Sequence, residues 1–281
     1  AFPAASSALR NPPSARDFAL ESTGPSAPRQ LSGTASLFAI AAVVGGKRVL
    51  KQVRHDNRGG KQGFSPCANR PKHPAHMAVY LHEEDLPAGV LAPGPVAVDT
   101  ETMGLITPRD RLCLVQISDG QGDEHLVRFG PGSSYDAPNL KAVLADPARV
   151  KLYHFARFDL AAIEHYLGVV AAPVFCTKIA SKLTRTYTDR HGLKDLVREL
   201  LGKEISKQQQ SSDWGGAELS EAQREYAASD VRYLHAMQAI LAERLAREHR
   251  SDAAQAAFDY LPHRARLDLM GWADKDIFSH E

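Results

Sequence analysis

The chain has 281 residues, of which 43% are hydrophobic, and a formal net charge of +1. This length and apolar content allow a sizeable core, and no apolar run reaches the roughly 20 residues of a membrane span, so no membrane contact is expected. Residues 1–76 carry 11 Lys/Arg against 3 Asp/Glu, whereas the remainder carries 23 against 30. The second part therefore lacks the overall basic character of a general nucleic-acid binder.

Residues 1–76 are rich in Ala, Ser, Pro, Gly and Arg, which predicts a disordered leader. A transit peptide or signal sequence ranks second for such a segment. Position 1 is Ala and Met77 opens the first convincing structured stretch, so a misannotated extension, read through from a misplaced start, is a further interpretation. We expect the function to reside in residues 77–281.

The segments after Met77 alternate between strand and helix patterns. Strands are predicted over 96–101, 112–118, 124–129, 150–155 and 174–176. Helices are predicted over 139–145, 157–167, 193–201 and 220–248, the last opened by a capping box, with one more after Cys176. The first three strands suggest an antiparallel meander. The pattern predicts a mixed α/β fold with a five-stranded sheet flanked by helices.

The three cysteines, Cys67, Cys113 and Cys176, are widely spaced. This spacing favours buried thiols over a zinc knuckle or a disulfide framework. Reduced thiols are typical of a cytoplasmic protein, and we expect that location.

Two carboxylates stand two positions apart on the strand predicted over 96–101. Residues i and i+2 of a strand share a face, so Asp99 and Glu101 point to the same side. Like charges at that separation repel, and an apolar strand end desolvates them, unless a cation neutralises the pair. An exposed strand terminus is the alternative interpretation.

Two further acids fall on the apolar stripes of predicted helices. At roughly 100° per residue, Asp159 lies within the stripe of the 157–167 helix and Asp230 within that of the 220–248 helix. Tyr226 precedes Asp230 by about one turn. For either helix alone, a satisfied, partly buried Asp or a partner of the helix N-terminus is an alternative.

The four acids together favour a metal site. Inward carboxylates without matching inward Lys or Arg are costly to desolvate, whereas hard divalent cations such as Mg²⁺ or Mn²⁺ take such oxygen ligands. Two ions of this kind clamp the attacking and leaving oxygens of a phosphoryl displacement. The pattern therefore predicts phosphodiester hydrolysis, with the Tyr226 phenol orienting the attacking water or helping to deprotonate it.

Three motifs follow one another in the chain. They are Asp99-Thr-Glu101, His154-Phe-Ala-Arg-Phe158-Asp159 and Tyr226-Ala-Ala-Ser-Asp230. Each is weak alone, but their order on a strand, a helix start and a helix makes a strong signal. On these residues, the chain from about Met77 onward resembles the ribonuclease D group of DEDD exonucleases, in the tyrosine-containing (DEDDy) subclass. The resemblance implies an RNase H-like fold, two-metal chemistry and hydrolysis from the RNA 3′ end that releases nucleoside 5′-monophosphates.

The resemblance also implies roles for individual residues. Asp99, Glu101 and Asp230 would hold the ion that activates water, and Asp99 would bridge to a second ion, which Asp159 reaches directly or through water. His154 stands where many relatives have Asn, and either contacts the substrate or a metal-bound water, or makes a structural hydrogen bond. Contacts to the terminal nucleotide are implied for Thr102, Met103, Gly104, Leu105 and Phe158.

Only about 31 residues follow Arg250, so no helical RNA-binding domain of the HRDC type is expected. RNA affinity would then come from the exonuclease domain. Lys178, Lys182 and Arg185 recur on one helical face and are candidate phosphate contacts, although an ordinary solvated face fits the same spacing. Trp214, in a polar loop, either stacks on a base or pins the loop to the core.

The sequence thus predicts a 3′-5′ exoribonuclease with two Mg²⁺ or Mn²⁺ ions that acts on RNA with a free 3′ end, in tRNA or small-RNA processing. A DNA exonuclease of the same subclass is the alternative, because no residue plainly senses a 2′-hydroxyl. An inactive RNA-binding scaffold is a third interpretation, disfavoured because no carboxylate of the set is missing.

Overall fold

The computed structural model describes residues 77–280. The leader predicted over 1–76, and Cys67 with it, lies outside the described residues. Cys113 and Cys176 are buried free thiols, as the sequence predicts. No helix among the described residues is both long enough and apolar enough to cross a membrane.

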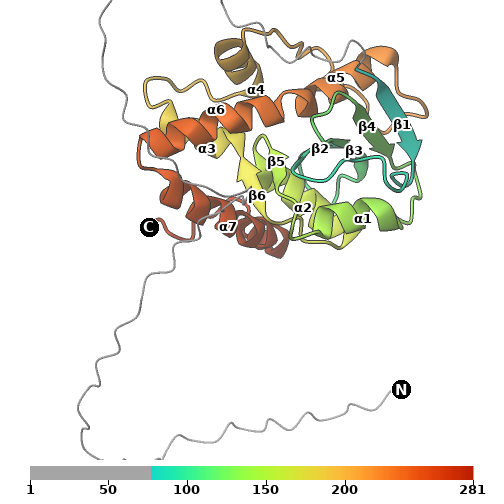
Figure 1. The fold of residues 1–281 in the computed structure, drawn as a ribbon. Coiled ribbons are helices and arrows are strands. Elements are labelled where there is room, and N and C mark those ends of the chain that lie inside the picture. The colour runs from blue at the N-terminus through green and yellow to red at the C-terminus, as the bar shows by residue number, and fades with distance from the viewer. Residues whose placement is uncertain (1–76, 281) are drawn as a thin grey trace, which may run out of the picture. The chain divides into compact units, whose positions relative to one another are not determined.

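The centre of the fold is a mixed sheet with the strand order β1-β4-β3-β2-β5-β6 (Figure 1). Strands β2, β3 and β4 form the predicted antiparallel meander, and β5 and β6 extend the sheet in parallel with β2. Every residue of β3 is buried, because this strand lies between two others and has helices over both faces. The strands are β1 Val79–Glu83, β2 Val96–Thr102, β3 Leu112–Ser118, β4 Glu124–Arg128, β5 Lys151–Tyr153 and β6 Val174–Cys176.

The sheet has six strands, so the prediction of five was short by one. The additional strand is β1, which lies at the edge and pairs in parallel with β4. None of its five residues is fully buried. A half-exposed edge strand carries no buried apolar run, which is the signal that identified the other strands.

Helices cover both faces of the sheet (Figure 1). Helices α5 and α6 lie along one face, and α1, α2 and α7 lie on the other. The helices are α1 Pro138–Ala145, α2 Ala156–Leu167, α3 Thr177–Thr184, α4 Leu193–Leu196 with the π-helical continuation Val197–Leu201, α5 Glu221–Arg232, α6 Leu234–Arg247, and α7 Ser251–Leu267 with the continuation Asp268–Trp272.

The helix predicted over 220–248 is in fact two helices, α5 and α6, which meet at Tyr233. Its start is as predicted, because the Ser220 hydroxyl accepts a hydrogen bond from the Gln223 amide and the Gln223 side chain accepts one from the Ser220 amide. Helix α5 packs mainly on β3 and β4, whereas α6 packs on β5 and α3. In a twisted sheet, the strand direction rotates from one edge to the other. One straight helix could therefore not pack along both β4 and β5.

Candidate active site

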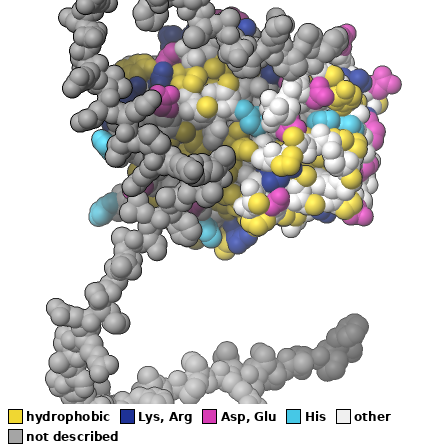
Figure 2. All heavy atoms as spheres, viewed as in Figure 1, with side chains coloured by type: hydrophobic (Ala, Val, Ile, Leu, Met, Phe, Trp, Pro, Cys, Tyr) yellow, Lys and Arg dark blue, Asp and Glu magenta, His cyan; other side chains and the backbone are white. Residues whose placement is uncertain are grey.

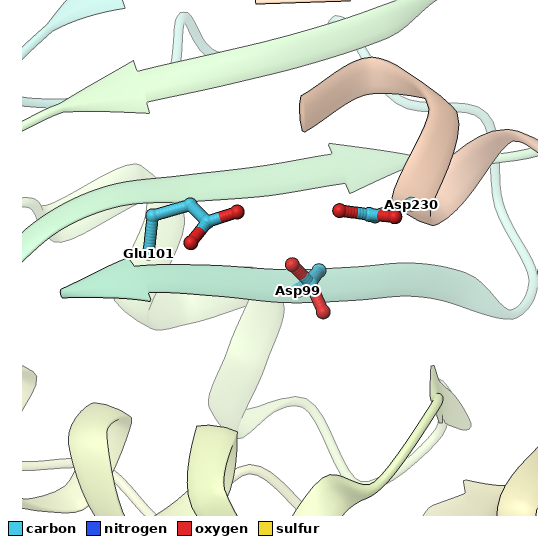
Figure 3. Close-up of side chains that lie close together, drawn as sticks. All are labelled: Asp99, Glu101 and Asp230. Atoms are coloured by element: carbon cyan, nitrogen blue, oxygen red, sulfur yellow. The ribbon is translucent and has the colours of Figure 1, made fainter. Parts of the chain in front are cut away.

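Three carboxylates from two elements converge on one face of the sheet (Figure 3). Strand β2 carries Asp99 and Glu101 on that face, and α5 brings Asp230 over it. One oxygen of each carboxylate lies within 4.8 Å of the other two. Asp99 also accepts a hydrogen bond of 3.3 Å from Gln116 Nε2, on the neighbouring strand β3. The two periodicities of strand and helix therefore place these acids as the sequence predicts.

Asp159, in the first turn of α2, is the fourth acid of the site. Its side chain is buried, and Oδ1 accepts a hydrogen bond of 2.7 Å from Thr100 Oγ1. Thr100 stands between Asp99 and Glu101 on β2, and its side chain points to the opposite face of the strand. Strand β2 thus carries two of the acids and forms a hydrogen bond to a third through Thr100.

The four carboxyl groups lack counter-charges. Burial is the largest cause of a raised pKa in each, and it raises the pKa of Glu101 to about 9 and those of Asp159 and Asp230 to about 7. The pKa of Asp99 is raised well above its usual value by burial and then by repulsion from the other three. Among residues 77–280, no Lys, Arg or His forms an ion pair with any of the four.

This donor set fits divalent metal ions. Hard cations such as Mg²⁺ bind carboxylate oxygens, and three such oxygens within 4.8 Å of one another can belong to one coordination sphere. A bound dication would turn the mutual repulsion of the acids into attraction and return their pKa values toward the ordinary range. The acids that destabilise one another without metal would therefore be stabilised by it.

Tyr226 lies one turn before Asp230 on α5, so its hydroxyl is close enough to the Asp230 carboxylate for the two groups to affect each other's pKa. Burial, followed by the negative charge of Asp230, Glu101 and Asp99, raises the pKa of the phenol far above its usual value. The group therefore stays protonated near neutral pH. A protonated phenol donates a hydrogen bond, so this position favours orientation of a water molecule over its deprotonation.

Asp99, Glu101 and Asp230 line a cavity of about 700 Å³, a size typical of ligand sites, and Asp159 lies outside its lining. Its wall includes every substrate-contact residue predicted from the sequence, namely Thr102, Met103, Gly104, Leu105, His154 and Phe158. Met103 is 58% exposed and Leu105 is 85% exposed, so both apolar side chains are available to a ligand. A side chain at Gly104 would collide with the Asp110 carboxylate, which lies 2.3 Å from the position of an added Cβ.

His154 is held by the protein itself. Its Nδ1 lies 2.9 Å from Thr177 Oγ1, which in turn donates a hydrogen bond to the Tyr153 carbonyl. Burial, followed by the nearby charge of Lys178, lowers the pKa of His154 to about 3, so the ring is neutral. Of the alternatives for His154, the structural hydrogen bond is the one observed.

Trp214 and Arg185 also have structural contacts. Trp214 is 4% exposed and belongs to a small hydrophobic cluster that includes Tyr226, so it pins its loop to the core. Arg185 is 1% exposed and forms an ion pair with Glu199. Neither interpretation of Arg185 from its spacing, a phosphate contact or a solvated helix face, matches this burial, because its guanidinium faces the interior.

Basic side chains reach the cavity from three other positions. Lys178, Lys194 and Lys207 line it, although Lys182, on the same helix as Lys178, does not. On the face in Figure 2, acidic and basic side chains of the described residues are interspersed. The cavity thus carries basic side chains of its own, as expected if nucleic-acid contacts are local.

Phe155 is one of the cavity residues that the sequence did not single out. It precedes α2 with φ 75°, in the left-handed region, and is 47% exposed. A bulky residue in that backbone conformation is uncommon and often marks a functional site. Sequence patterns carry no signal for it, since Phe has no preference for such a conformation.

The fold and the four acids define an exonuclease domain of the DEDD type. Residues 81–246 match the 3′-5′ exonuclease family, and the chain belongs to this family. It is similar to solved structures of NrnC from Brucella melitensis. One, with bound Mg²⁺, is 53% identical, with a TM-score of 0.69 over 73% of this chain and 100% of NrnC. Another, bound to pGG, has the same identity and coverage and a TM-score of 0.70.

Ribonuclease D proteins are also similar to the chain. That of Gluconacetobacter diazotrophicus is 40% identical over 157 residues, which are 56% of this chain and 39% of that protein. The solved Escherichia coli RNase D is 29% identical, with a TM-score of 0.53 over 62% of this chain and 45% of that one. The chain thus spans about two fifths of the length of the curated ribonuclease D relatives that it matches.

Proposed function

We propose that this protein is a metal-dependent 3′-5′ exoribonuclease, which removes nucleoside 5′-monophosphates one at a time from an RNA with a free 3′ end. The observation that carries the proposal is the convergence of three uncompensated carboxylates, Asp99, Glu101 and Asp230, with Tyr226 in one cavity, and the charge of Asp159 is close enough to raise the pKa of Asp99. Such a set holds divalent cations and suits in-line displacement at phosphorus. Membership of the 3′-5′ exonuclease family supports the direction of hydrolysis in this proposal.

In this proposal, Asp99, Glu101 and Asp230 would hold one divalent ion, and Asp99 and Asp159 would hold a second. Bound Mg²⁺ or Mn²⁺ supplies Lewis-acid stabilisation of the attacking and leaving oxygens. The Tyr226 hydroxyl would donate its one hydrogen bond to the attacking water and so orient it. Water forms the new bond to phosphorus and gives up a proton to solvent, the bond from phosphorus to the 3′ oxygen breaks, and that oxygen is protonated.

In this proposal, the terminal nucleotide binds in a slot beside β2, the part of the cavity that is lined by Thr102, Met103, Gly104, Leu105 and Phe158. Met103 and Leu105 offer exposed apolar side chains for a base or sugar, and Gly104 lets the backbone approach closely. Phe158 and Thr102 complete the slot, whereas His154 supports it through its bond to Thr177.

RNA is favoured over DNA as the substrate. The curated relatives are named ribonuclease D, and a similar solved protein is bound to pGG. A DNA exonuclease is the alternative, because no residue plainly senses the 2′-hydroxyl that distinguishes RNA from DNA. Precursors of tRNA and other small RNAs are the substrate class we propose. The free thiols of Cys113 and Cys176 fit the proposed cytoplasmic location, which cell fractionation tests.

The proposal is tested with a 5′-labelled RNA and a DNA of the same sequence, each with Mg²⁺, with Mn²⁺ and with EDTA. Stepwise shortening of the RNA from its 3′ end, with release of 5′-monophosphates, is the expected result, and EDTA or the Asp99→Asn substitution should abolish it. Asp136→Asn, at an exposed acid outside the cavity, is the matched control. Wild-type activity in Asp99→Asn, or an unchanged rate with EDTA, contradicts the proposal, and faster shortening of the DNA selects the alternative.

A further inference from the structure

Phe155 is an aromatic residue that the core does not use. Among the residues that the structure describes, its ring belongs to neither hydrophobic cluster, and the residue is 47% exposed in the wall of the active-site cavity. Its φ of 75° holds the ring at the start of α2 in a backbone conformation that bulky residues seldom adopt. Strain of this kind persists where the surrounding structure imposes it, which is common at binding sites.

A cation lies over this ring. Lys178 Nζ, from α3, is 4.1 Å from the centroid of the Phe155 ring. No carboxylate of residues 77–280 forms an ion pair with Lys178. The Lys178 ammonium therefore places an unneutralised positive charge over one face of a half-exposed aromatic ring. A nucleotide presents the complementary pair, a base with a π face and an anionic phosphate.

The pair lies toward the Asp159 side of the acidic site. Phe155 precedes Asp159 by four positions at the start of the same helix, whereas Tyr226 approaches from α5 beside Asp230. In the proposed reaction, the attacking water stands near Tyr226. In-line displacement puts the leaving oxygen on the opposite side of the phosphorus, so the nucleotide that keeps this oxygen faces Asp159 and Phe155.

We propose that Phe155 and Lys178 form a subsite for the second nucleotide from the RNA 3′ end, in which the base stacks on the face of the Phe155 ring opposite Lys178 and the Lys178 ammonium binds a backbone phosphate of the same nucleotide. This assignment rests on the proposed function. Stacking uses the π face that every base has. The subsite therefore recognises the presence of a base at this position and tolerates all four bases.

A double-mutant cycle between protein and RNA tests the stacking. One RNA has an intact 3′ end, a second has an abasic ribose at the second position, and a third has it at the terminal position. Binding is measured by fluorescence anisotropy with Ca²⁺ in place of Mg²⁺, after a check that no product forms. For the wild type, the abasic second position should weaken binding roughly 5- to 100-fold, and Phe155→Ala should weaken binding of the intact RNA by a similar factor.

The decisive result is the coupling. In Phe155→Ala the abasic second position should make no further difference, and Phe155→Trp should restore the sensitivity to base removal. Phe278→Ala, at an exposed aromatic residue outside the cavity, is the matched control and should behave as the wild type. The proposal is overturned if loss of the second base weakens binding equally in the wild type and in Phe155→Ala. It is also overturned if the coupling is found at the terminal position instead, or if the wild type shows no measurable binding. Circular dichroism of each variant checks that it is folded. Recovery of the base sensitivity in Phe155→Trp would also show that the loss in Phe155→Ala is not caused by misfolding.

The phosphate contact has a separate readout in salt. For single strands, the slope of log K against log salt concentration changes by about 0.7 for each phosphate neutralised. Lys178→Met should lower the slope by about that amount, and Lys182→Met, at an exposed lysine of the same helix outside the cavity, should leave it unchanged. Equal slopes for Lys178→Met and the wild type contradict the phosphate contact. Hydrolysis of the intact RNA with Mg²⁺ is followed in parallel, so failure of the proposed function is recognised independently.

Discussion

Thr100 Oγ1 lies 2.7 Å from Asp159 Oδ1, and this hydrogen bond joins strand β2 to helix α2 at the acidic site. The donor is buried, and the acceptor makes no ion pair among residues 77–280. The position of Asp159 relative to Asp99 and Glu101 is thus fixed by a neutral partner. A neutral donor orients the carboxylate without competing for its negative charge.

Thr100→Val removes this hydrogen bond and keeps the shape of the side chain. Partners that orient metal ligands typically contribute 10- to 100-fold to metal affinity or activity. We expect kcat/KM to fall by roughly that factor, with a matching rise in the Mg²⁺ concentration needed for half-maximal activity. Thr184→Val, at a buried threonine whose hydroxyl donates to Ala180 within its own helix, is the control. Unchanged Mg²⁺ dependence in Thr100→Val would show that Asp159 needs no such support.

Tyr226→Phe removes the hydroxyl beside Asp230 in the cavity wall. Because the raised pKa keeps this phenol protonated, its role in turnover is to orient water, and loss of the group should lower kcat by about 100-fold or more with little change in KM. Initial rates on a labelled RNA measure both constants. Tyr80→Phe, on the edge strand β1, is the control. A parallel loss in RNA affinity and in turnover would assign Tyr226 to substrate binding instead.

Local periodicity predicts the acidic site residue by residue. The period of two puts Asp99 and Glu101 on one face of a strand, and the helical period puts Asp159 and Asp230 on inward stripes. Periodicity does not show that these three segments meet, because contacts between distant segments depend on the whole topology. The order of the three motifs in the chain, through the family resemblance, indicates that the three segments form one site.

Other features lie beyond such rules for identifiable reasons. The buried face of α7 is Ala254, Phe258, Leu261 and Ala265, at helical spacing, but two of these are Ala and Pro262 lies inside the helix, so the signal is weak. Arg185 has the spacing of a surface cation, and its burial follows from Glu199, fourteen residues away, through an ion pair that no local pattern reveals. The exposed ring of Phe155 depends on a single backbone torsion.

The metal-free protein should lose stability as the pH rises. The folded pKa values, about 7 for Asp159 and Asp230 and about 9 for Glu101, lie above the values near 4 of unfolded chains. The folded state then binds more protons than the unfolded state, so this contribution is fully present below about pH 4 and is lost as the pH rises through 7 to 9. With EDTA, the melting temperature should fall between pH 6 and pH 9, and Mg²⁺ should reverse the fall.

Asp230→Asn isolates the contribution of one acid. With EDTA at pH 8, this variant should melt above the wild type, by about 2–4 °C for each kcal/mol of repulsion removed, and its decline with pH should be shallower. Mg²⁺ should stabilise it less than the wild type, since a ligand is missing. Asp136→Asn, at an exposed acid, should follow the wild-type curve. A wild type whose metal-free stability rises from pH 6 to pH 9 contradicts the expectation.

Arg185→Gln tests whether the buried guanidinium is structural. Arg185 is 1% exposed and donates to Glu199, to Ser181 Oγ and to the Arg190 carbonyl, so it ties α3 to the segment that leads into α4. Losing a buried partner of this kind is destabilising by about 3–5 kcal/mol where both groups are buried, and by less here because Glu199 is partly exposed. We expect a lower denaturation midpoint, measured by urea unfolding.

Arg198→Gln provides the contrast. Arg198 forms an ion pair with Asp195 at the surface, where such pairs contribute about 0–1 kcal/mol to the free energy of unfolding. The urea midpoint of Arg198→Gln should therefore stay close to that of the wild type. The salt dependence of RNA binding separates the two possible roles of Arg185, because a structural residue leaves the slope unchanged whereas a phosphate contact lowers it by about 0.7. A lower slope in Arg185→Gln with an unchanged urea midpoint would restore the phosphate contact predicted from its helical spacing.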